Sequence, residues 1–246
     1  MPTALVTGGS RGFGRVIAMR LASDGHQVAI NYAHDTTAAD RVVADIAAAG
    51  GQARAFRFDV TDEAALSTGM AAVRDGLGEP DIVVNNAVGP HDTIPLEEQT
   101  WDDHWAQIRF CVKAPVLMVQ NIARPWKQRG AGTLINIGSE VHDIGNAEFA
   151  HYVGAKSAMV GLTRSWARDL GPHGITVNLV APGFIPVERH EDMDKAGMIE
   201  AYLPHLPFHR MGQAADIAAG VSFLASSDAS FMNGQTLTIN GGRTFT

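Results

Sequence analysis

The stretch ALVTGGSRGFG, residues 4–14, is the part of the sequence that is most informative about the fold. It begins with a short apolar run, passes through four glycines, and is followed by apolar residues at helical spacing up to Leu21. That order predicts a strand, a tight turn and a helix. Glycines let the backbone approach a pyrophosphate, and the amides that open a helix offer it a positive dipole end. The stretch therefore suggests a dinucleotide site, although the spacing Gly-x-x-x-Gly-x-Gly, taken alone, suits a plain strand-to-helix turn as well.

The rest of the chain alternates strand-like and helix-like segments without a linker, repeat or low-complexity tract. Several of the strand-like runs are almost wholly apolar, which is typical of a parallel sheet covered on both faces. Right-handed crossovers then give a doubly wound α/β fold of the Rossmann type, with a mostly parallel seven-stranded sheet and one domain over residues 1–246. The expected strands are 3–7, 27–32, 53–58, 81–85, 132–138, 174–180 and 235–239.

Three polar residues indicate the chemistry. Tyr152 and Lys156 stand four residues apart in a predicted helix, so they share one helix face. The Lys156 ammonium then lies beside the phenol and favours its anionic form, which makes Tyr152 a usable proton carrier. Ser139 ends the apolar run TLINIGS, where its hydroxyl is placed to hydrogen-bond a carbonyl or alcohol oxygen. Taken singly, these residues have ordinary alternatives as a half-buried aromatic, a solvated charge and a strand-end hydroxyl.

Motifs along nearly the whole chain occur in one order and at characteristic spacings. They are TGGSRGFG at 7–14, Asp59-Val60, NNA at 85–87, Ser139, YVGAK at 152–156, APG at 181–183 and NGQTLTINGG at 233–242. The ordered set resembles the classical short-chain dehydrogenase/reductase family, and most of all its 3-oxoacyl-[acyl-carrier-protein] reductase branch. The resemblance implies hydride transfer between a nicotinamide cofactor and a ketone or secondary alcohol. It also implies Ser139, Tyr152 and Lys156 as catalytic residues.

The resemblance also implies a set of contacts to the cofactor. Asp59 is expected to meet the adenine amino group, with a helix cap for the segment near Thr61 as the alternative. Lys156 is expected to bind the nicotinamide ribose as well as to assist Tyr152. The expected cofactor-binding residues are Gly8, Ser10, Arg11, Gly12, Phe13, Gly14, Ala33, His34, Asp59, Val60, Asn86, Ala87, Tyr152, Lys156, Pro182, Gly183 and Ile185.

The end of the second strand bears on the choice of cofactor. An acid there accepts hydrogen bonds from the adenosine ribose and repels a 2′-phosphate. This chain has Ala33 at the matching position, while Arg11, with Ser10 and His34 as further donors, offers its guanidinium to a phosphate. We therefore expect NADP(H) in preference to NAD(H). Asp35 leaves the alternative open, because a slip of one residue in the comparison brings an acid back.

The chain departs from the family pattern at several places. Cys111 stands where the family usually has an Asn that holds a water for a proton relay, and its plain interpretation is a small buried apolar residue. Val88 replaces a usual Gly and Val187 replaces a frequent Thr. The segment at about 184–211 is rich in His, Pro and charge, and we interpret it as a substrate lid, with a plain surface excursion as the alternative.

Bulk properties exclude several classes of protein. The net charge of −7 argues against nucleic acid or an anionic membrane as the main partner. No run is long and apolar enough to span a membrane, no leader precedes the first strand, and a single cysteine suits a reducing compartment, so we expect a cytoplasmic protein. The ten histidines show no metal-ligand spacing, so we expect no metal site.

Substrate and assembly are less constrained. The resemblance implies a homotetramer whose interfaces include the expected long helices at about 101–129 and 152–170. An acyl-carrier-protein or coenzyme A thioester is one candidate substrate, and a small ketone, sugar, polyol or cyclic alcohol is another. A catalytically silent nucleotide-binding relative is the rival of a different class, against which the intact Ser139, Tyr152 and Lys156 argue.

Overall fold

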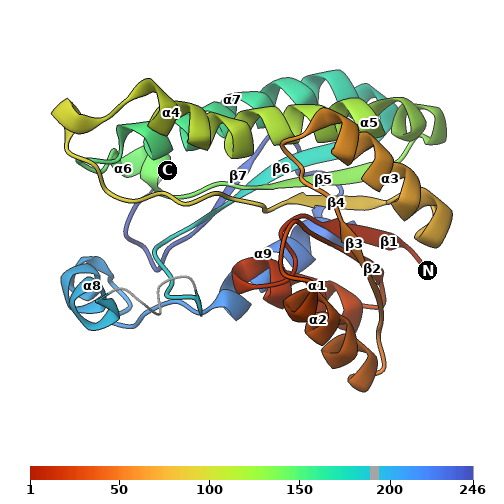
Figure 1. Ribbon diagram of the computed structural model, residues 1–246, viewed down its shortest axis with the longest axis horizontal. Helices are drawn as coiled ribbons and strands as arrows, with labels where there is room; N and C mark the ends of the chain where they lie inside the picture. The colour runs from red at the N-terminus through yellow and green to blue at the C-terminus, as the bar shows by residue number, and fades with distance from the viewer. Residues whose placement is uncertain (189–193, 246) are drawn as a thin grey trace.

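A seven-stranded parallel sheet forms the centre of the molecule (Figure 1). The structure is a computed structural model that describes residues 1–188 and 194–245. The strand order is β3-β2-β1-β4-β5-β6-β7, and every neighbouring pair is parallel. This arrangement confirms the predicted Rossmann-type fold. The strands are β1 (Thr3–Val6), β2 (Gln27–Tyr32), β3 (Gln52–Arg57), β4 (Ile82–Asn85), β5 (Gly132–Ile137), β6 (Ile175–Pro182) and β7 (Thr236–Ile239).

Helices cover both faces of the sheet (Figure 1). One face carries α1 (Gly12–Ser23), α2 (Thr36–Ala48) and α9 (Ala214–Ala225). The other face carries α3 (Glu63–Leu77), α4 (Trp101–Ile108), α5 (Ala114–Arg129) and α7 (Ala150–Leu170). Two shorter helices, α6 (Val141–Ile144) and α8 (Lys195–Tyr202), lie beyond the carboxyl ends of the strands. Single helical turns are η1 (Leu96–Glu98), η3 (Gly171–His173), η5 (Leu203–His205) and η6 (Ser227–Ala229).

Two hydrophobic cores lie on the two faces of the sheet. Successive side chains of a strand point to opposite faces, so Ala4 and Val6 join the core under α1 and α9 while Leu5 joins the core under α3 and α5. Each of these three side chains is fully buried. The continuous apolar strands of the sequence therefore reflect burial on both faces, and they place all the carboxyl strand ends at one edge.

The stretch expected as one helix over about 101–129 is helical throughout, but it is not a regular α-helix. It is α4, a π-helical turn η2 (Arg109–Lys113), and then α5. Cys111 lies in this turn, is 1 % exposed, and packs against Ala155 and Leu179. A π-helical turn inside an α-helix is often found at a functional site. The helix expected over 152–170 is confirmed as α7.

A buried chain of polar side chains fixes α7 on the sheet. Asn85 Nδ2 donates to Asn136 Oδ1 at 2.9 Å, and Asn136 Nδ2 donates to Thr163 Oγ1 at 2.9 Å. These side chains come from β4, β5 and α7, and all three are buried. A buried amide without a hydrogen-bond partner costs free energy of folding. These hydrogen bonds therefore favour one position of α7 relative to the strand ends.

Candidate active site

The glycine turn between β1 and α1 passes unusually close to neighbouring backbone. A Cβ on Gly14 would lie 2.2 Å from the Gly8 carbonyl oxygen and 2.6 Å from Asn86 Nδ2, so any larger residue must displace the turn. Gly8 has a φ of +62°, in the left-handed region that favours glycine. Arg11 is the exposed N-cap of α1, Ser10 is half-buried beside it, and Phe13 packs partly against the core.

Thr7 and Asn31, which sequence reasoning left out of the site, hold this turn in shape. The Thr7 hydroxyl donates to the Val84 carbonyl and accepts from the amides of Asn86, at 2.9 Å, and Ala87, at 3.0 Å. Asn31 Oδ1 accepts from the Gly8 amide, while its Nδ2 donates to the Phe58 carbonyl. Asn86 Nδ2 donates to the Thr7 carbonyl at 2.8 Å. The loops after β1 and β4 therefore form one rigid unit.

The turn accepts an anion in this structure. The amide of Gly12, at the start of α1, donates to Glu188 Oε2 at 3.0 Å. A carboxylate at a helix N-terminus is stabilised by the free amides and the helix dipole, as a phosphate is. The closely packed glycines and this anion-accepting amide fit the pyrophosphate of a dinucleotide. The residues that would hold it are those of the turn at 8–14.

Tyr152 and Lys156 lie together in the first turns of α7, as predicted. The Lys156 Nζ atom is 5.7 Å from the centroid of the Tyr152 ring and donates to the Ile137 carbonyl at 2.7 Å. Both side chains are buried. Ile137 is the last residue of β5, and Ser139 follows two residues later, half-buried. Lys156 therefore reaches the carboxyl end of β5, two residues before Ser139 in the chain.

Aromatic side chains surround the Tyr152 ring. The His91 ring stacks on it with a centroid distance of 4.3 Å and an interplanar angle of 7°, and the Phe149 ring lies 5.2 Å away. His91 Nδ1 is 2.9 Å from the Gly89 carbonyl oxygen. These contacts restrict rotation of the phenol ring. Sequence reasoning did not single out His91, because its contact with Tyr152 spans sixty-one positions of the chain.

The strand ends that would meet an adenosine ribose carry no free acid. Ala33 and His34 directly follow β2, and Asp35 is the N-cap of α2, where its carboxylate accepts from the Ala38 amide at 2.8 Å. Arg57, at the end of the neighbouring β3, donates from Nε to the Ala33 carbonyl at 3.2 Å. Its guanidinium therefore lies beside the position where a ribose-binding acid would stand.

Asp59 does not cap a helix. Its Oδ1 accepts from the Thr61 amide and hydroxyl, both at 2.8 Å, whereas the N-cap of α3 is Asp62. The cap alternative raised by the sequence is therefore wrong, and the adenine role stays a prediction. The Val60 side chain is buried in the core beneath α3 and α5, so its predicted contact with the cofactor would have to come from its backbone.

The segment after β6 lies at the same edge. Pro182 is the last residue of β6, and its carbonyl accepts from the Glu140 amide at 2.9 Å. The Gly183 amide donates to the Ile239 carbonyl, and Ile185 is buried. A Cβ on Gly183 would lie 2.6 Å from the Tyr202 hydroxyl. This loop is therefore held between the sheet and the lid segment.

The expected lid at about 184–211 contains α8 and η5 in its described part, while residues 189–193 lie outside the described residues. Its buried members are Ile185, Tyr202 and Leu206, and it also includes the exposed Phe208. The segment packs on the site edge, and its lid role stays a prediction.

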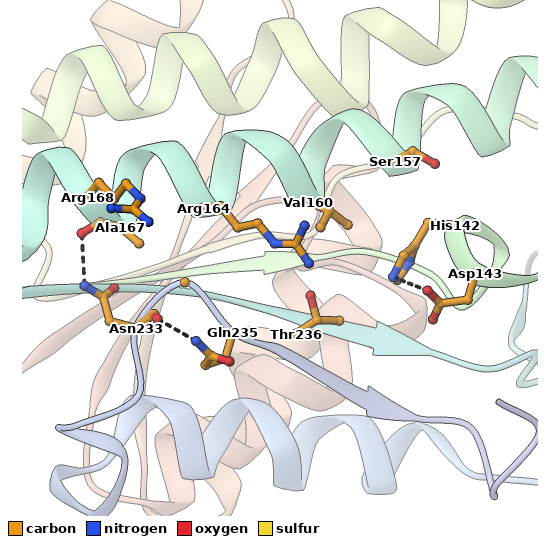
Figure 2. A pocket seen from close by; sticks show the side chains of 11 residues that line it. His142, Asp143, Ser157, Val160, Arg164, Ala167, Arg168, Asn233, Gln235 and Thr236 are labelled. Atoms are coloured by element: carbon orange, nitrogen blue, oxygen red, sulfur yellow. Dashed lines mark hydrogen bonds and ion pairs between the residues drawn. The ribbon is translucent and has the colours of Figure 1, made fainter. Parts of the chain in front are cut away.

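A hollow of about 820 Å³ lies beside α7, with His142 and Asp143 of α6 at one end of its lining (Figure 2). It runs between α7 and the approach to β7, with Arg164 and Arg168 on the helix side and Asn233 and Gln235 opposite. Ser139, Tyr152 and Lys156 do not line it. Two exposed arginines on an open polar surface do not define a ligand, so this hollow is no part of the candidate active site.

Two further expectations concern absences. Over residues 1–188 and 194–245, no group of three or more His, Cys, Asp or Glu side chains is arranged to hold a metal ion. In the same described part of the chain, no helix combines the length and apolar character that crossing a membrane requires.

Comparisons with known proteins agree with this geometry. A family model described as enoyl-(acyl carrier protein) reductase matches residues 8–244. The 3-oxoacyl-[acyl-carrier-protein] reductase FabG of Staphylococcus aureus is 40 % identical over 242 residues, which cover 98 % of this chain and 97 % of the relative. The corresponding reductase of Synechocystis is 36 % identical over 97 % of this chain and 95 % of its own length.

Solved structures are similar over the whole fold. A double mutant of a short-chain dehydrogenase/reductase from Serratia marcescens has a TM-score of 0.91 at 35 % identity, covering 99 % of this chain and 98 % of the other. A dehydrogenase/reductase from Sinorhizobium meliloti has a TM-score of 0.89 at 37 % identity, covering 99 % of this chain and 95 % of the other. Fold and matches together define an oxidoreductase that acts on CH–OH groups with a nicotinamide cofactor. The chain belongs to the short-chain dehydrogenase/reductase family.

Proposed function

We propose that this protein interconverts a ketone and a secondary alcohol with NADP(H), using Ser139, Tyr152 and Lys156 as its catalytic residues. The observation that carries the proposal is the position of Lys156. Its ammonium is held by the Ile137 carbonyl beside the buried Tyr152 ring, at the strand end that Ser139 follows. The anion-accepting turn at the start of α1 lies at the same edge of the sheet.

The chemistry divides among few groups. A bound reduced nicotinamide supplies the hydride. Tyr152 donates its hydroxyl proton to the oxygen of the substrate carbonyl as negative charge develops there, and the Ser139 hydroxyl donates a hydrogen bond that orients this oxygen. The Lys156 ammonium stabilises the resulting tyrosinate by its proximity, and it would also hold the nicotinamide ribose of a bound cofactor. His91 and Phe149 keep the phenol in a fixed orientation.

The preference for NADP(H) has two supports. No free acid stands at the end of β2, because Ala33 occupies that position and Asp35 is engaged as a helix cap. Arg57 lies against Ala33 and Arg11 is exposed at the glycine turn, so two guanidinium groups are available to a 2′-phosphate. A charge-assisted contact of this kind is absent from NAD(H) binding.

The substrate that we propose first is a 3-oxoacyl thioester, because relatives about 40 % identical carry the name 3-oxoacyl-[acyl-carrier-protein] reductase. A small ketone, sugar, polyol or cyclic alcohol is the second candidate. We further propose a cytoplasmic homotetramer. Trp101 and Trp105 on α4 and Phe231 near β7 are exposed aromatic side chains that suit subunit contacts, whereas Trp166 packs against the monomer core.

The test measures NADPH oxidation with a panel of ketones and 3-oxoacyl thioesters, and repeats it with NADH. We expect turnover with NADPH in preference to NADH. Tyr152→Phe should bind the cofactor normally and lose about 10²- to 10⁴-fold in turnover, the usual contribution of a positioned acid. Near-normal turnover would remove Tyr152 from this role, and a clear preference for NADH would overturn the cofactor assignment. Cofactor binding without turnover across the panel would favour the catalytically silent relative.

A further inference from the structure

A buried carboxylate directly follows Ser139. Glu140 is 2 % exposed, and its Oε1 atom accepts from the Tyr202 hydroxyl at 2.6 Å and from Arg243 Nη1 at 3.0 Å. Taking a carboxylate out of water costs several kcal/mol unless close partners compensate. The position of Glu140 is therefore tied to the positions of Tyr202 and Arg243, which come from two distant parts of the chain.

Tyr202 connects this carboxylate to the lid segment. It is the last residue of α8 and is 8 % exposed. Its hydroxyl donates to Glu140 and accepts from the Phe184 amide at 3.0 Å, and the Phe184 ring packs edge-on against its ring at 5.4 Å. Burial, and then the hydrogen bond to Glu140, raise the pKa of Tyr202 to about 12, so the phenol keeps its proton and remains a donor at physiological pH.

Arg243 connects the same carboxylate to the carboxyl-terminal segment. Its guanidinium carbon lies 4.4 Å from the centroid of the Tyr202 ring, in cation–π geometry. The adjoining glycines of this segment lie near the lid as well: a Cβ on Gly241 would be 3.5 Å from Leu206, and one on Gly242 would be 3.3 Å from Pro207. The carboxyl-terminal segment therefore lies along the lid and shares its attachment to Glu140.

The main chain of Glu140 reaches the loop that is expected to meet the nicotinamide. Its amide donates to the Pro182 carbonyl at 2.9 Å, and the Tyr202 hydroxyl sits where a Gly183 side chain would otherwise be. One residue thus links the strand end of Ser139, the loop after β6, the lid and the carboxyl-terminal segment.

We propose that Glu140 is a positioning residue that fastens the lid, through Tyr202 and Arg243, over the edge that carries Ser139. Its consequence for activity rests on the proposed function. The carboxylate sets the affinity for substrate and leaves the proton transfer by Tyr152 unchanged, because its Oε1 atom binds Tyr202 and Arg243. Its Oε2 atom is buried and has no hydrogen-bond partner within the described part of the chain. If the Glu140 contacts only stabilised the fold, their loss would lower the free energy of unfolding and leave the lid in place.

The first test uses Glu140→Gln in the full-length protein and does not depend on activity. The amide keeps the shape and an acceptor for Tyr202 but loses the charge that faces Arg243. Limited trypsin digestion, mapped by mass spectrometry, reports cleavage after Lys195 and Arg210 inside the lid. We expect these cleavages to become at least about fivefold faster in Glu140→Gln, because the opening of a segment governs its proteolysis.

The control is Asp81→Asn, which breaks a more exposed ion pair. It removes the carboxylate of the Arg129–Asp81 ion pair, whose Nη1–Oδ1 distance is 2.9 Å and which lies at the opposite, amino-terminal edge of the sheet. Lid cleavage in this variant should stay at the parental rate. Cleavage after Arg20, within α1, monitors global unfolding in every variant, and it should not rise in Glu140→Gln under conditions where lid cleavage does.

The second test is kinetic. Glu140→Gln should raise the substrate KM about tenfold, which corresponds to about 1.4 kcal/mol, with kcat changed less than threefold. Arg243→Met should reproduce this effect, and the double variant should be no worse than either single one, because both changes break the same contact. A double variant whose KM rises by the product of the two single effects would contradict this coupling.

Two results would overturn the proposal: lid cleavage and KM that both match the parent, or a fall in kcat at unchanged KM, which would move Glu140 into the chemical step. If the parental protein turns over no substrate, the proposed function fails, while the trypsin experiment still decides whether Glu140 fastens the lid.

Discussion

Gly14→Ala is the sharpest test of the dinucleotide turn. Its single added carbon would lie 2.2 Å from the Gly8 carbonyl oxygen and 2.6 Å from Asn86 Nδ2. Cβ atoms in proteins essentially never approach another heavy atom closer than 3.0 Å, so the turn must open by roughly 0.8 Å at Gly8. Neither obstacle is a flexible side-chain end, because one is backbone and the other is held by the Thr7 carbonyl.

Forced overpacking of this kind costs about 1–3 kcal/mol. The free energy of unfolding of a domain is about 5–15 kcal/mol, so the variant should still fold. The displaced peptide is part of the turn that we expect to hold the pyrophosphate. Relieving this strain moves the turn away from the position that binds the cofactor. A loss of about 1.4 kcal/mol in binding free energy, roughly half of the largest strain, lowers cofactor affinity about tenfold.

The assay pairs urea unfolding with a fluorescence titration of NADPH. Gly161→Ala is the control, because a Cβ there meets nothing within 4 Å and the residue sits in the exposed part of α7. It should leave NADPH affinity unchanged, because the added methyl group contacts no part of the glycine turn. Parental stability together with parental affinity in Gly14→Ala would refute the reasoning that this turn is closely packed and binds the cofactor.

Two further predictions concern charge and pH. Glu188→Gln removes the carboxylate that accepts from the Gly12 amide and should tighten NADPH binding by about two- to tenfold at low salt, because the anion competes for the helix N-terminus; calorimetric titration with unchanged or weaker affinity would contradict this. Burial lowers the pKa of His151, so the unfolded chain binds this proton more readily and stability should fall as pH drops below about 6.5. His151→Leu should therefore lose less stability than the parent between pH 7.5 and 5.5 in urea melts, and equal losses would exclude His151 as a source of the dependence.

Local sequence patterns were enough to predict much of the fold and part of the candidate site. The seven strands were predicted close to their observed limits. Burial on both faces leaves a direct signature in the apolar runs of β1, β2, β4 and β6, whereas the edge strand β3 is largely exposed. The four-residue spacing of Tyr152 and Lys156 placed them on one helix face, and covalent geometry alone guarantees that relation once the helix forms. The glycines at 8–14 predicted a tight turn, and a Cβ on Gly14 would lie 2.2 Å from the Gly8 carbonyl oxygen.

Interruptions and caps were harder to predict. The π-helical turn at Arg109–Lys113 leaves no mark in the apolar periodicity of its neighbours, so one long helix was expected there. Asp59 and Asp62 both stand near the start of α3, and only the path of the chain decides that Asp62 caps it while Asp59 closes a turn on Thr61. Such choices depend on small differences between local hydrogen-bonding alternatives.

Periodicity and spacing over a few positions were therefore enough to predict the strands, most helices and the chemistry that neighbouring residues share. Tertiary structure alone decided which distant residues complete the site: Asn31 under the glycine turn, His91 on the Tyr152 ring, and Tyr202 and Arg243 on Glu140. The last two contacts span 62 and 103 positions. Contacts of that range leave no periodic signal, since they exist only once the sheet has brought the strand ends, the lid and the carboxyl-terminal segment to one edge.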